Sequence, residues 1–387
     1  MRKILLPFIL LFLVALHQSC QQGHGQQADG YQATAPVSQT ADNYWLLTDP
    51  EADIYNYLRE PVTIDGRSKL MIFNHQQNTL LFYDIEKQEL EKKIKYDFQG
   101  PNAVNAVFPG GGLHMISKDS ILIYSQRQAT FYLSDLKGSI YKKTRIKNDS
   151  IGFGAIGTYS TLAHRGNNVY MQSLPATVGE FKTDYENRPN MFGSIDLNTG
   201  LTKEFVLDYP KPYQGKDHSQ QLKMADIIYS AKADKFVISF PLSSDIYVTD
   251  FAGYTKTYPA QSKLVGTSTE VEKKRKDIGP NQISGHYFWI NDRYGKLVYD
   301  PVSGYYFREA MKGLGERDYE AREFNTQKEI VVLDANFRQV ASLPHHGGTF
   351  MYYFFDKNQI YWNRDFIKYN FERENEDTIY FERKRFY

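Results

Sequence analysis

From Tyr44 to the C-terminus, the chain consists of short runs of Ile, Val, Leu, Tyr, Phe and Thr separated by Gly, Asn and Asp. Almost no segment keeps the 3.6-residue apolar period of an amphipathic helix. Short runs of β-branched and aromatic residues between turn formers are typical of strands. The pattern therefore predicts an all-β protein.

One turn recurs along this part of the chain: an apolar strand that ends in Asp, followed by Gly or Asn and a second strand. A carboxylate at the end of a strand can accept a backbone N–H bond two residues on, and Gly or Asn supplies a positive φ, so each repeat specifies a hairpin. The interval between turns, about 50 to 85 residues, leaves room for three more strands. The repeated aspartates are Asp84, Asp135, Asp196, Asp250 and Asp334.

The repeats predict a six-bladed β-propeller of four-stranded antiparallel blades, formed by a single domain over residues 44–387. A lone sheet of this kind cannot bury both of its faces, whereas radial stacking covers each face with a neighbouring blade. Tyr44 to Thr48 are expected to complete the last blade. A pair of β-sandwiches is the alternative, although no Pro- or Gly-rich linker divides the chain near its middle. The predicted blades span 62–96, 112–146, 159–207, 225–259, 286–343 and 350–387.

The N-terminus has the pattern of an export signal. Arg2 and Lys3 precede an apolar run that ends at Leu16, and polar residues then lead to Cys20. The run is shorter than the roughly 20 residues of a permanent membrane-spanning helix, so residues 1–19 are predicted to be a cleaved signal peptide. Ser19 before Cys20 resembles a bacterial lipobox, in which the cysteine becomes the lipid-modified first residue. The alternative is an ordinary secretory signal with a cysteine near its end.

Cys20 is the only cysteine of the chain, which excludes an internal disulfide framework and a thiolate zinc site. An exported protein rarely keeps one unpaired thiol without a use for it, and lipid attachment is such a use. Residues 20–43, rich in Gln, Ala and Gly, are predicted to be the lipidated cysteine and a flexible tether. The membrane is therefore an expected partner, through the lipid on Cys20.

Charge and aromatic content restrict the remaining partners. The chain of 387 residues has 46 Lys and Arg against 45 Asp and Glu, which argues against a nucleic-acid surface. Its aromatic content of 15% is ample for a large packed core. We therefore expect a folded envelope protein that binds no nucleic acid.

Residues 69 to 147 contain five notable segments: Lys69-Leu70-Met71-Ile72-Phe73-Asn74, Asn78-Thr79-Leu80, Tyr83-Asp84-Ile85, Gly100-Pro101-Asn102 and Asp119-Ser120-Ile121. This stretch resembles a family of uncharacterised Bacteroidota lipoproteins known as domain of unknown function 4221. The resemblance implies a propeller without an established activity, and no catalytic residue can be carried over from it. Surface-exported lipoproteins of Bacteroidota carry acidic residues after the cysteine, whereas Gln21 and Gln22 follow here, so we expect an outer-membrane anchor facing the periplasm.

Histidines and arginines in the predicted innermost strands are candidates for a channel or ligand site. His114, His164 and His286 fall in these strands, and Arg165 and Arg293 lie nearby. Innermost strands line the central channel of a propeller, so the imidazoles could converge on a divalent cation or an anionic ligand. Structural roles for most of the histidines are the alternative.

The triplet Gly-Pro-Asn occurs twice, ending at Asn102 and at Asn281, each time ahead of the first strand of a predicted blade. The fixed φ of Pro and the capping amide of Asn suit a rigid turn between blades. If the turns lie at the mouth of the ring, the two amides could instead bind a sugar or a peptide.

The sequence contains no GxSxG, HExxH, P-loop or GxGxxG signature, so no catalytic residue is predicted. We expect a lipid-anchored binding module for a protein or a glycan, without a cofactor. The alternative is a metal-dependent hydrolase, lyase or lactonase with its site at the central channel and a divalent cation bound there.

Overall fold

The computed structural model describes residues 42–47, 59–104, 111–147, 151–153, 162–175, 190–214, 218–266, 280–323, 326–345, 353–356, 359–363 and 378–385. The predicted signal peptide, Cys20 and nearly all of the predicted tether lie outside this part of the chain.

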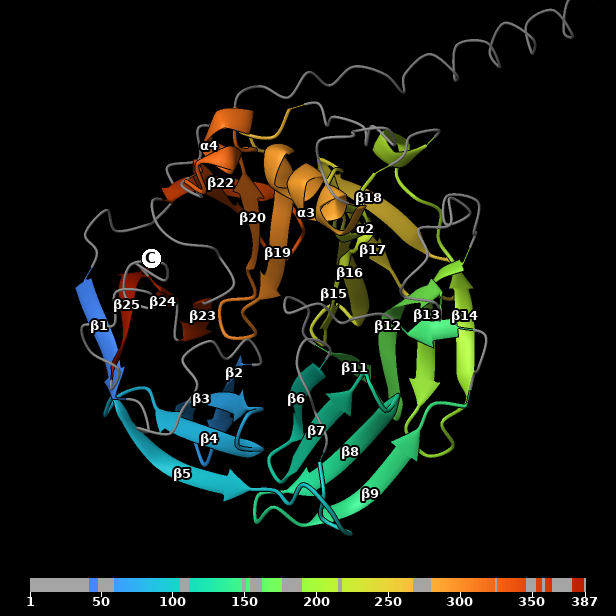
Figure 1. The fold of residues 1–387 in the computed structure, drawn as a ribbon, viewed down its shortest axis with the longest axis vertical. Helices are drawn as coiled ribbons and strands as arrows, with labels where there is room; N and C mark the ends of the chain where they lie inside the picture. Colours follow the sequence, from blue (N-terminus) through green and yellow to red (C-terminus); the bar gives the residue numbers. More distant parts are fainter. Residues whose placement is uncertain are drawn as a thin grey trace, which may run out of the picture. The chain divides into compact units, whose positions relative to one another are not determined.

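The described strands form six antiparallel sheets that follow one another round a ring, a six-bladed β-propeller (Figure 1). Both the fold class and the number of blades predicted from the sequence are confirmed. Blade one contains β2 (Arg59–Ile64), β3 (Arg67–Asn74), β4 (Thr79–Asp84) and β5 (Glu89–Lys95). Blade two contains β6 (Gly111–Ser117), β7 (Ser120–Ser125), β8 (Thr130–Asp135) and β9 (Ile140–Arg145).

Blade three has a divided innermost strand, since β10 and β11 pair with opposite ends of β12. Blade three contains β10 (Ile151–Phe153), β11 (Ala163–Arg165), β12 (Asn168–Pro175), β13 (Asn190–Asp196) and β14 (Thr202–Val206). Blade four contains β15 (Asp226–Ser230), β16 (Lys235–Ser239), β17 (Asp245–Thr249) and β18 (Thr255–Pro259). Blade five contains β19 (Arg293–Tyr299), β20 (Tyr306–Met311), β21 (Lys328–Leu333) and β22 (Gln339–His345).

Blade six joins the two ends of the described chain. It contains β23 (Tyr353–Asp356), β24 (Gln359–Asn363), β25 (Thr378–Arg385) and β1 (Asp42–Leu47). β1 pairs with β25 along its whole length, from Asp42 opposite Arg383 to Leu47 opposite Thr378. The N-terminal strand therefore closes the ring, as the sequence predicted.

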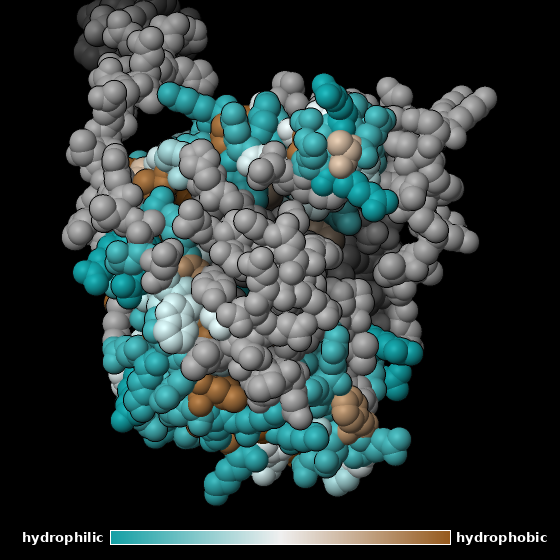
Figure 2. Space-filling model, turned by 60° about the vertical axis from the view of Figure 1, so that its left-hand side comes forward, coloured by the Kyte–Doolittle hydropathy of each residue, from teal (hydrophilic) through white to brown (hydrophobic). Residues whose placement is uncertain are grey.

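The core consists of six apolar clusters, each between two neighbouring blades. Met71 and Phe73 of β3 pack toward blade two, whereas Leu70 and Ile72 pack toward blade six. Because successive side chains of a strand point to opposite faces, a strand that is covered on both faces is a nearly continuous apolar run. On the face drawn in Figure 2, the described surface is mostly hydrophilic, with separate hydrophobic patches.

The aromatic runs of blades five and six contribute to this core. Tyr306, Phe307, Phe354, Phe355 and Trp362 are all buried between blades. They therefore pack the propeller and do not form an exposed platform for a ligand.

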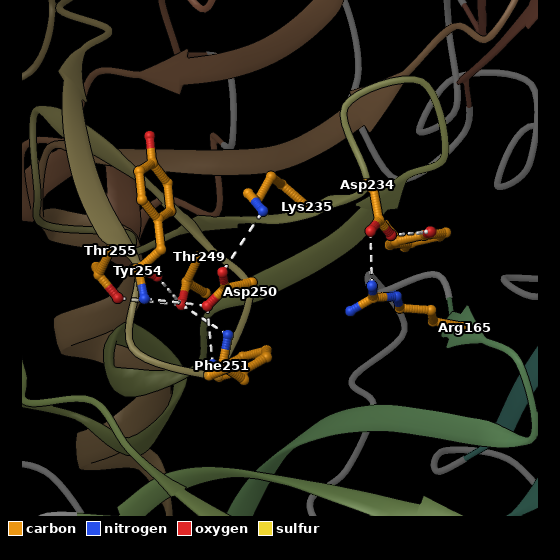
Figure 3. Close-up of polar contacts among 10 residues, drawn as sticks. Arg165, Asp234, Lys235, Thr249, Asp250, Phe251, Tyr254 and Thr255 are labelled. Atoms are coloured by element: carbon orange, nitrogen blue, oxygen red, sulfur yellow. Dashed lines mark hydrogen bonds and ion pairs between the residues drawn. The ribbon is translucent and has the colours of Figure 1, made fainter.

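Each repeated aspartate lies at the turn between the third and the fourth strand of its blade. Asp135 Oδ1 accepts the backbone N–H groups of Lys137 and Ser139 at 2.8 and 2.9 Å, and Gly138 has a φ of +89°. Figure 3 shows the equivalent turn at Asp250, which accepts from Ala252 and Tyr254. Backbone hydrogen bonds, first that of Ser139, hold the pKa of Asp135 below its usual value. The predicted turn mechanism is confirmed after Asp135, Asp196 and Asp250. In the turns after Asp84 and Asp334 the positive φ belongs to Gln88 and Phe337 instead of Gly or Asn.

The described helices lie in connections between strands. The connection from blade three to blade four contains η2 (Lys211–Tyr213) and α2 (Gln220–Lys223), the connection from blade four to blade five contains α3 (Pro280–Ile290), and α4 (Glu316–Glu320) lies between β20 and β21 of blade five. The prediction that blade five begins with a strand at His286 is wrong, because His286 lies in α3 and the first strand starts at Arg293. Pro280, which has no N–H to lose and a helical φ, suits the first position of a helix. The aromatic residues that follow have strand propensity, but packing overrides it.

Candidate functional site

The candidate site is the central channel, which the first strand of each blade lines. Two carboxylates on these strands connect neighbouring blades. Glu60 on β2 accepts the backbone N–H of Met115 on β6 at 3.0 Å, and Asp226 on β15 accepts that of Leu297 on β19 at 2.8 Å. Blade one is thereby bonded to blade two, and blade four to blade five, by the same device.

Glu60 also pairs with His114. Its Oε1 lies 2.8 Å from His114 Nδ1. Burial lowers the pKa of His114, but the charge and the hydrogen bond of Glu60 raise it more, so the pKa lies above its usual value. The imidazole is therefore held in its charged form over a wider pH range than a free histidine.

His164 on β11 lies beside His114, with 5.9 Å between the ring centroids. Burial, and then the charge of His114, lower the pKa of His164 below its usual value. Two of the five predicted channel residues thus form one pair, with one imidazole favouring the charged form and the other the neutral form.

Lys296 on β19 is a cation of the site and directly precedes Leu297, whose backbone N–H donates to Asp226. Burial lowers its pKa, and the charges of Asp226, Glu60 and Glu309 oppose that shift. Asp226 belongs to blade four and Glu60 to blade one, which are opposite each other in a ring of six (Figure 1). Groups from opposite blades can act on the same ammonium only across the channel, so these ionisable groups converge there.

Asp226 and Glu309 are the unusual acids of this group. Burial raises the pKa of Asp226 to about 7. Burial also raises the pKa of Glu309, against the charges of Lys328 and Arg293. Glu309 is 3% exposed, and its Oε1 has no hydrogen-bond partner within the described part of the chain. Both carboxyls therefore keep a proton to a higher pH than exposed acids do.

The other three predicted channel residues have different contacts, although the charge of Arg293 also acts on Glu309. Arg293 is buried, its guanidinium 4.1 Å from the ring centroid of Phe288 in α3. His286 contacts Glu316 of α4, at 3.2 Å from Nε2 to Oε1. Arg165 lies 2.6 Å from Asp234, in the turn between β15 and β16 (Figure 3).

The two Gly-Pro-Asn triplets differ in structure. Asn102 Oδ1 accepts the backbone N–H of Ile140, at the start of the outermost strand of blade two, with a distance of 3.3 Å. The amide therefore fixes a turn between blades at the outer edge of the ring. The second triplet leads into α3 and not into a strand, because its Pro280 is the first residue of that helix. Asn281 is a residue of α3, and its side chain is not among those that the structure describes.

Sequence reasoning missed four groups of the channel site: Glu60, Asp226, Lys296 and Glu309. A weak signal existed, because both acids lie at the beginning of the first strand of a blade. Asp226 is the first residue of β15, and Glu60 is the second residue of β2. Within the described residues, no group of three or more His, Cys, Asp and Glu side chains could hold a metal ion.

The fold and the site define a six-bladed propeller with a charged channel. A family model described as domain of unknown function (DUF4221) matches residues 55–341, so the chain belongs to this family, as the sequence resemblance implied.

Two solved structures have similar folds. A DUF4221 member from Bacteroides vulgatus aligns with a TM-score of 0.75 at 19% identity, covering 91% of this chain and 98% of that one. A protein from Bacteroides fragilis, described as exported, aligns with a TM-score of 0.52 at 13% identity, covering 93% and 97%. No curated protein matches this sequence. Among the described helices, none is long and apolar enough to cross a membrane.

Proposed function

We propose that this chain is a lipid-anchored binding protein of the bacterial cell envelope, which engages an envelope protein or a glycan at the channel of its propeller. The observation that carries the proposal is the convergence of Glu60, Asp226 and Lys296 from three blades. Groups of both signs, partly buried at one place, suit a polar ligand that offers both donors and acceptors. The two carboxylates are also held in place by backbone hydrogen bonds, which reduces the entropy lost on binding.

The anchoring part of the proposal rests on the sequence. A cleaved signal over residues 1–19, lipid on Cys20 and a tether to residue 43 would hold the propeller at the outer membrane, facing the periplasm. The exported Bacteroides fragilis protein of similar fold is compatible with this location. Mass spectrometry of the mature N-terminus tests it: an unmodified Cys20 would remove the lipid anchor from the proposal.

A second candidate function, a hydrolase, lyase or lactonase at the channel, has one observation in its favour. The pKa of Asp226, about 7, would let that carboxyl exchange a proton at neutral pH. A divalent cation bound at the channel belongs to this alternative. Turnover of a lactone or of a uronic-acid glycan that is lost in both Asp226→Asn and His164→Ala would favour catalysis over binding.

The binding proposal is tested with the mature protein against arrays of glycans and of purified envelope proteins, followed by calorimetry on each hit. Lys296→Met should weaken the dissociation constant of a channel ligand by about tenfold or more, because a charge-assisted hydrogen bond is lost. Lys118→Met, at an exposed turn between β6 and β7, makes the same change of charge away from the channel and should have no effect. Hits that bind both variants equally would place the ligand elsewhere.

A further inference from the structure

A pocket lies at the outer edge of the interface between blades one and two, away from the channel. It has a volume of about 590 Å³, within the usual range for small-molecule sites. One wall is the connection between the two blades, with Phe98, Gln99, Gly100 and Ala103. The other wall consists of Gln128, Thr130, Tyr132, Lys143 and Arg145.

The register of β8 and β9 explains the second wall. Tyr132 is opposite Lys143, and Thr130 is opposite Arg145. Side chains alternate along a strand, so these four residues share one face of the blade. Thr144 points to the other face, where its hydroxyl donates to the carbonyl of Leu197.

The first wall is rigid before any ligand binds. Asp97 and Ala103 form a bridge, and the Ala103 N–H donates to the Gly100 carbonyl at 3.2 Å. The side chain of Asn78 holds the Asp97 carbonyl at 2.8 Å. A preformed wall of this kind lowers the entropic cost of binding.

The pocket is cationic. Its lining contains Lys143 and Arg145 and no acidic residue, although the chain as a whole is nearly neutral. Neither cation pairs with a carboxylate among the described residues, and Lys143 Nζ contacts only the carbonyl of Gly100, at 3.4 Å, and the ring of Tyr132, at 5.7 Å from its centroid. Two unneutralised cations in one pocket favour an anionic ligand.

The remaining lining favours a sugar. Phe98 is 55% exposed at the edge of the pocket, and an exposed aromatic ring provides a flat apolar surface on which a sugar ring can stack. Tyr132 donates its hydroxyl to Gln128 Oε1, which leaves the amide N–H groups of Gln128 to donate to a ligand. Gln99 and Thr130 add further polar groups for hydroxyls.

We propose that this pocket binds the uronic acid residue of an acidic oligosaccharide. Arg145 and Lys143 hold the carboxylate, the side-chain amides and Thr130 bind ring hydroxyls, and Phe98 stacks on the sugar ring. A guanidinium can bind a carboxylate through two parallel hydrogen bonds, which selects it over a neutral hydroxymethyl group. The site is separate from the channel and does not depend on the function proposed there.

Calorimetry on the mature protein tests the proposal with four probes: a galacturonic acid trisaccharide, a glucuronic acid disaccharide, a neutral galactose trisaccharide and inorganic phosphate. We expect at least one of the acidic sugars to bind, and the neutral sugar to bind about tenfold more weakly or worse. Arg145→Gln should weaken binding of the acidic sugar by about tenfold, and Phe98→Ala by about fivefold. Both side chains are exposed, so these variants should fold.

Two matched variants distinguish binding in this pocket from binding at the channel or through overall charge. Arg67→Gln, at the exposed start of β3 in blade one, changes the charge as Arg145→Gln does and should leave affinity unchanged. Lys296→Met should also leave it unchanged, whereas a loss there and none in Arg145→Gln would place the sugar in the channel. The proposal is overturned if neither acidic sugar binds, if the neutral sugar binds equally well, or if phosphate displaces the sugar while Phe98→Ala has no effect.

Discussion

Single carboxylates in this propeller form hydrogen bonds between neighbouring blades, which the strands themselves do not. Strands within a blade share backbone hydrogen bonds, but first strands of neighbouring blades do not pair in one sheet. Glu60 and Asp226 accept a backbone N–H from the next blade and so add polar bonds between sheets to the apolar packing that joins them. Their negative charges also raise the pKa of the cationic groups around them, His114 and Lys296.

The pair of Glu60 and His114 predicts a pH-dependent contribution to stability. A histidine whose pKa is raised on folding contributes stability that is complete below the unfolded pKa, about 6.5, and is lost as the pH rises through the folded pKa. Glu60→Gln should therefore lower the free energy of unfolding by about 1 kcal/mol more at pH 5.5 than at pH 8.5.

Urea denaturation at the two pH values measures this difference. Asp226 and Glu309 titrate in both proteins, so their contributions cancel in the comparison. Glu320→Gln, on the exposed face of α4, is the control and should show equal effects at both pH values. A loss in Glu60→Gln that does not depend on pH would show that the ion pair contributes nothing.

At the scale of the element, the turns are specified by short signals that act locally. The aspartate accepts hydrogen bonds within the turn itself, and a residue with positive φ reverses the chain. Such a turn needs no distant contact to form. Some of these turns are also covered by a neighbouring strand, and there the glycine has a second role.

Gly200 and Gly66 separate the two roles. Both have positive φ, +75° and +74°, but a Cβ at Gly200 would lie 2.1 Å from the backbone carbonyl oxygen of Arg145, whereas nothing lies within 4 Å of one at Gly66. Gly66→Ala should cost about 1 kcal/mol for the left-handed conformation alone. Gly200→Ala should cost at least about 2 kcal/mol more, because a backbone carbonyl must move.

Chemical denaturation of both variants measures the difference between the turns. Equal losses would mean that the turn of blade three shifts freely away from β9, and would contradict the close contact between them.

At the scale of the molecule, closing the ring buries the last faces of the blades. Each apolar cluster needs residues from two blades, and the cluster between blades six and one includes Tyr44 and Leu46 of the N-terminal strand. Tyr44 packs against the rings of Tyr361, Phe354 and Phe381, and its hydroxyl donates to the carbonyl of Ile85 in blade one at 2.8 Å. β1 therefore holds the last blade to the first.

Tyr44→Ala should lower the free energy of unfolding by about 3 to 5 kcal/mol, the usual loss for a buried aromatic side chain. The neighbouring Trp45→Ala is the control, since Trp45 is 41% exposed and Tyr44 only 2%. Circular dichroism during urea unfolding measures both variants. A small loss in Tyr44→Ala would show that the ring is held closed without its N-terminal strand.

Much of the fold was predictable because its signals are local. The hydrogen bonds of each Asp turn span at most four residues, and the strands are rich in β-branched and aromatic residues. The sequence therefore indicated six blades and the strand that closes them. The errors have the same origin. The aromatic residues after Pro280 have strand propensity, and only their packing between α2 and α4 makes them a helix.

The site was less predictable. His114 and His164 were found because they lie on first strands, and the structure brings them together. Arg165, Arg293 and His286 have the same chemistry but other neighbours: an aspartate of the next blade, the aromatic rings of α3, and a glutamate of α4. A sequence shows which residues can ionise, and not which of them meet.

The sequence by itself therefore determined the strands, their turns, the family and the number of blades, since hydrophobic alternation and turn chemistry depend on residues close together in the chain. Only the tertiary structure decided that Glu60, Asp226 and Lys296 surround one channel and that Lys143 and Arg145 share a pocket with Phe98. Closing the ring brings distant residues together and removes water from between them, and these two changes shift the pKa values of the channel groups.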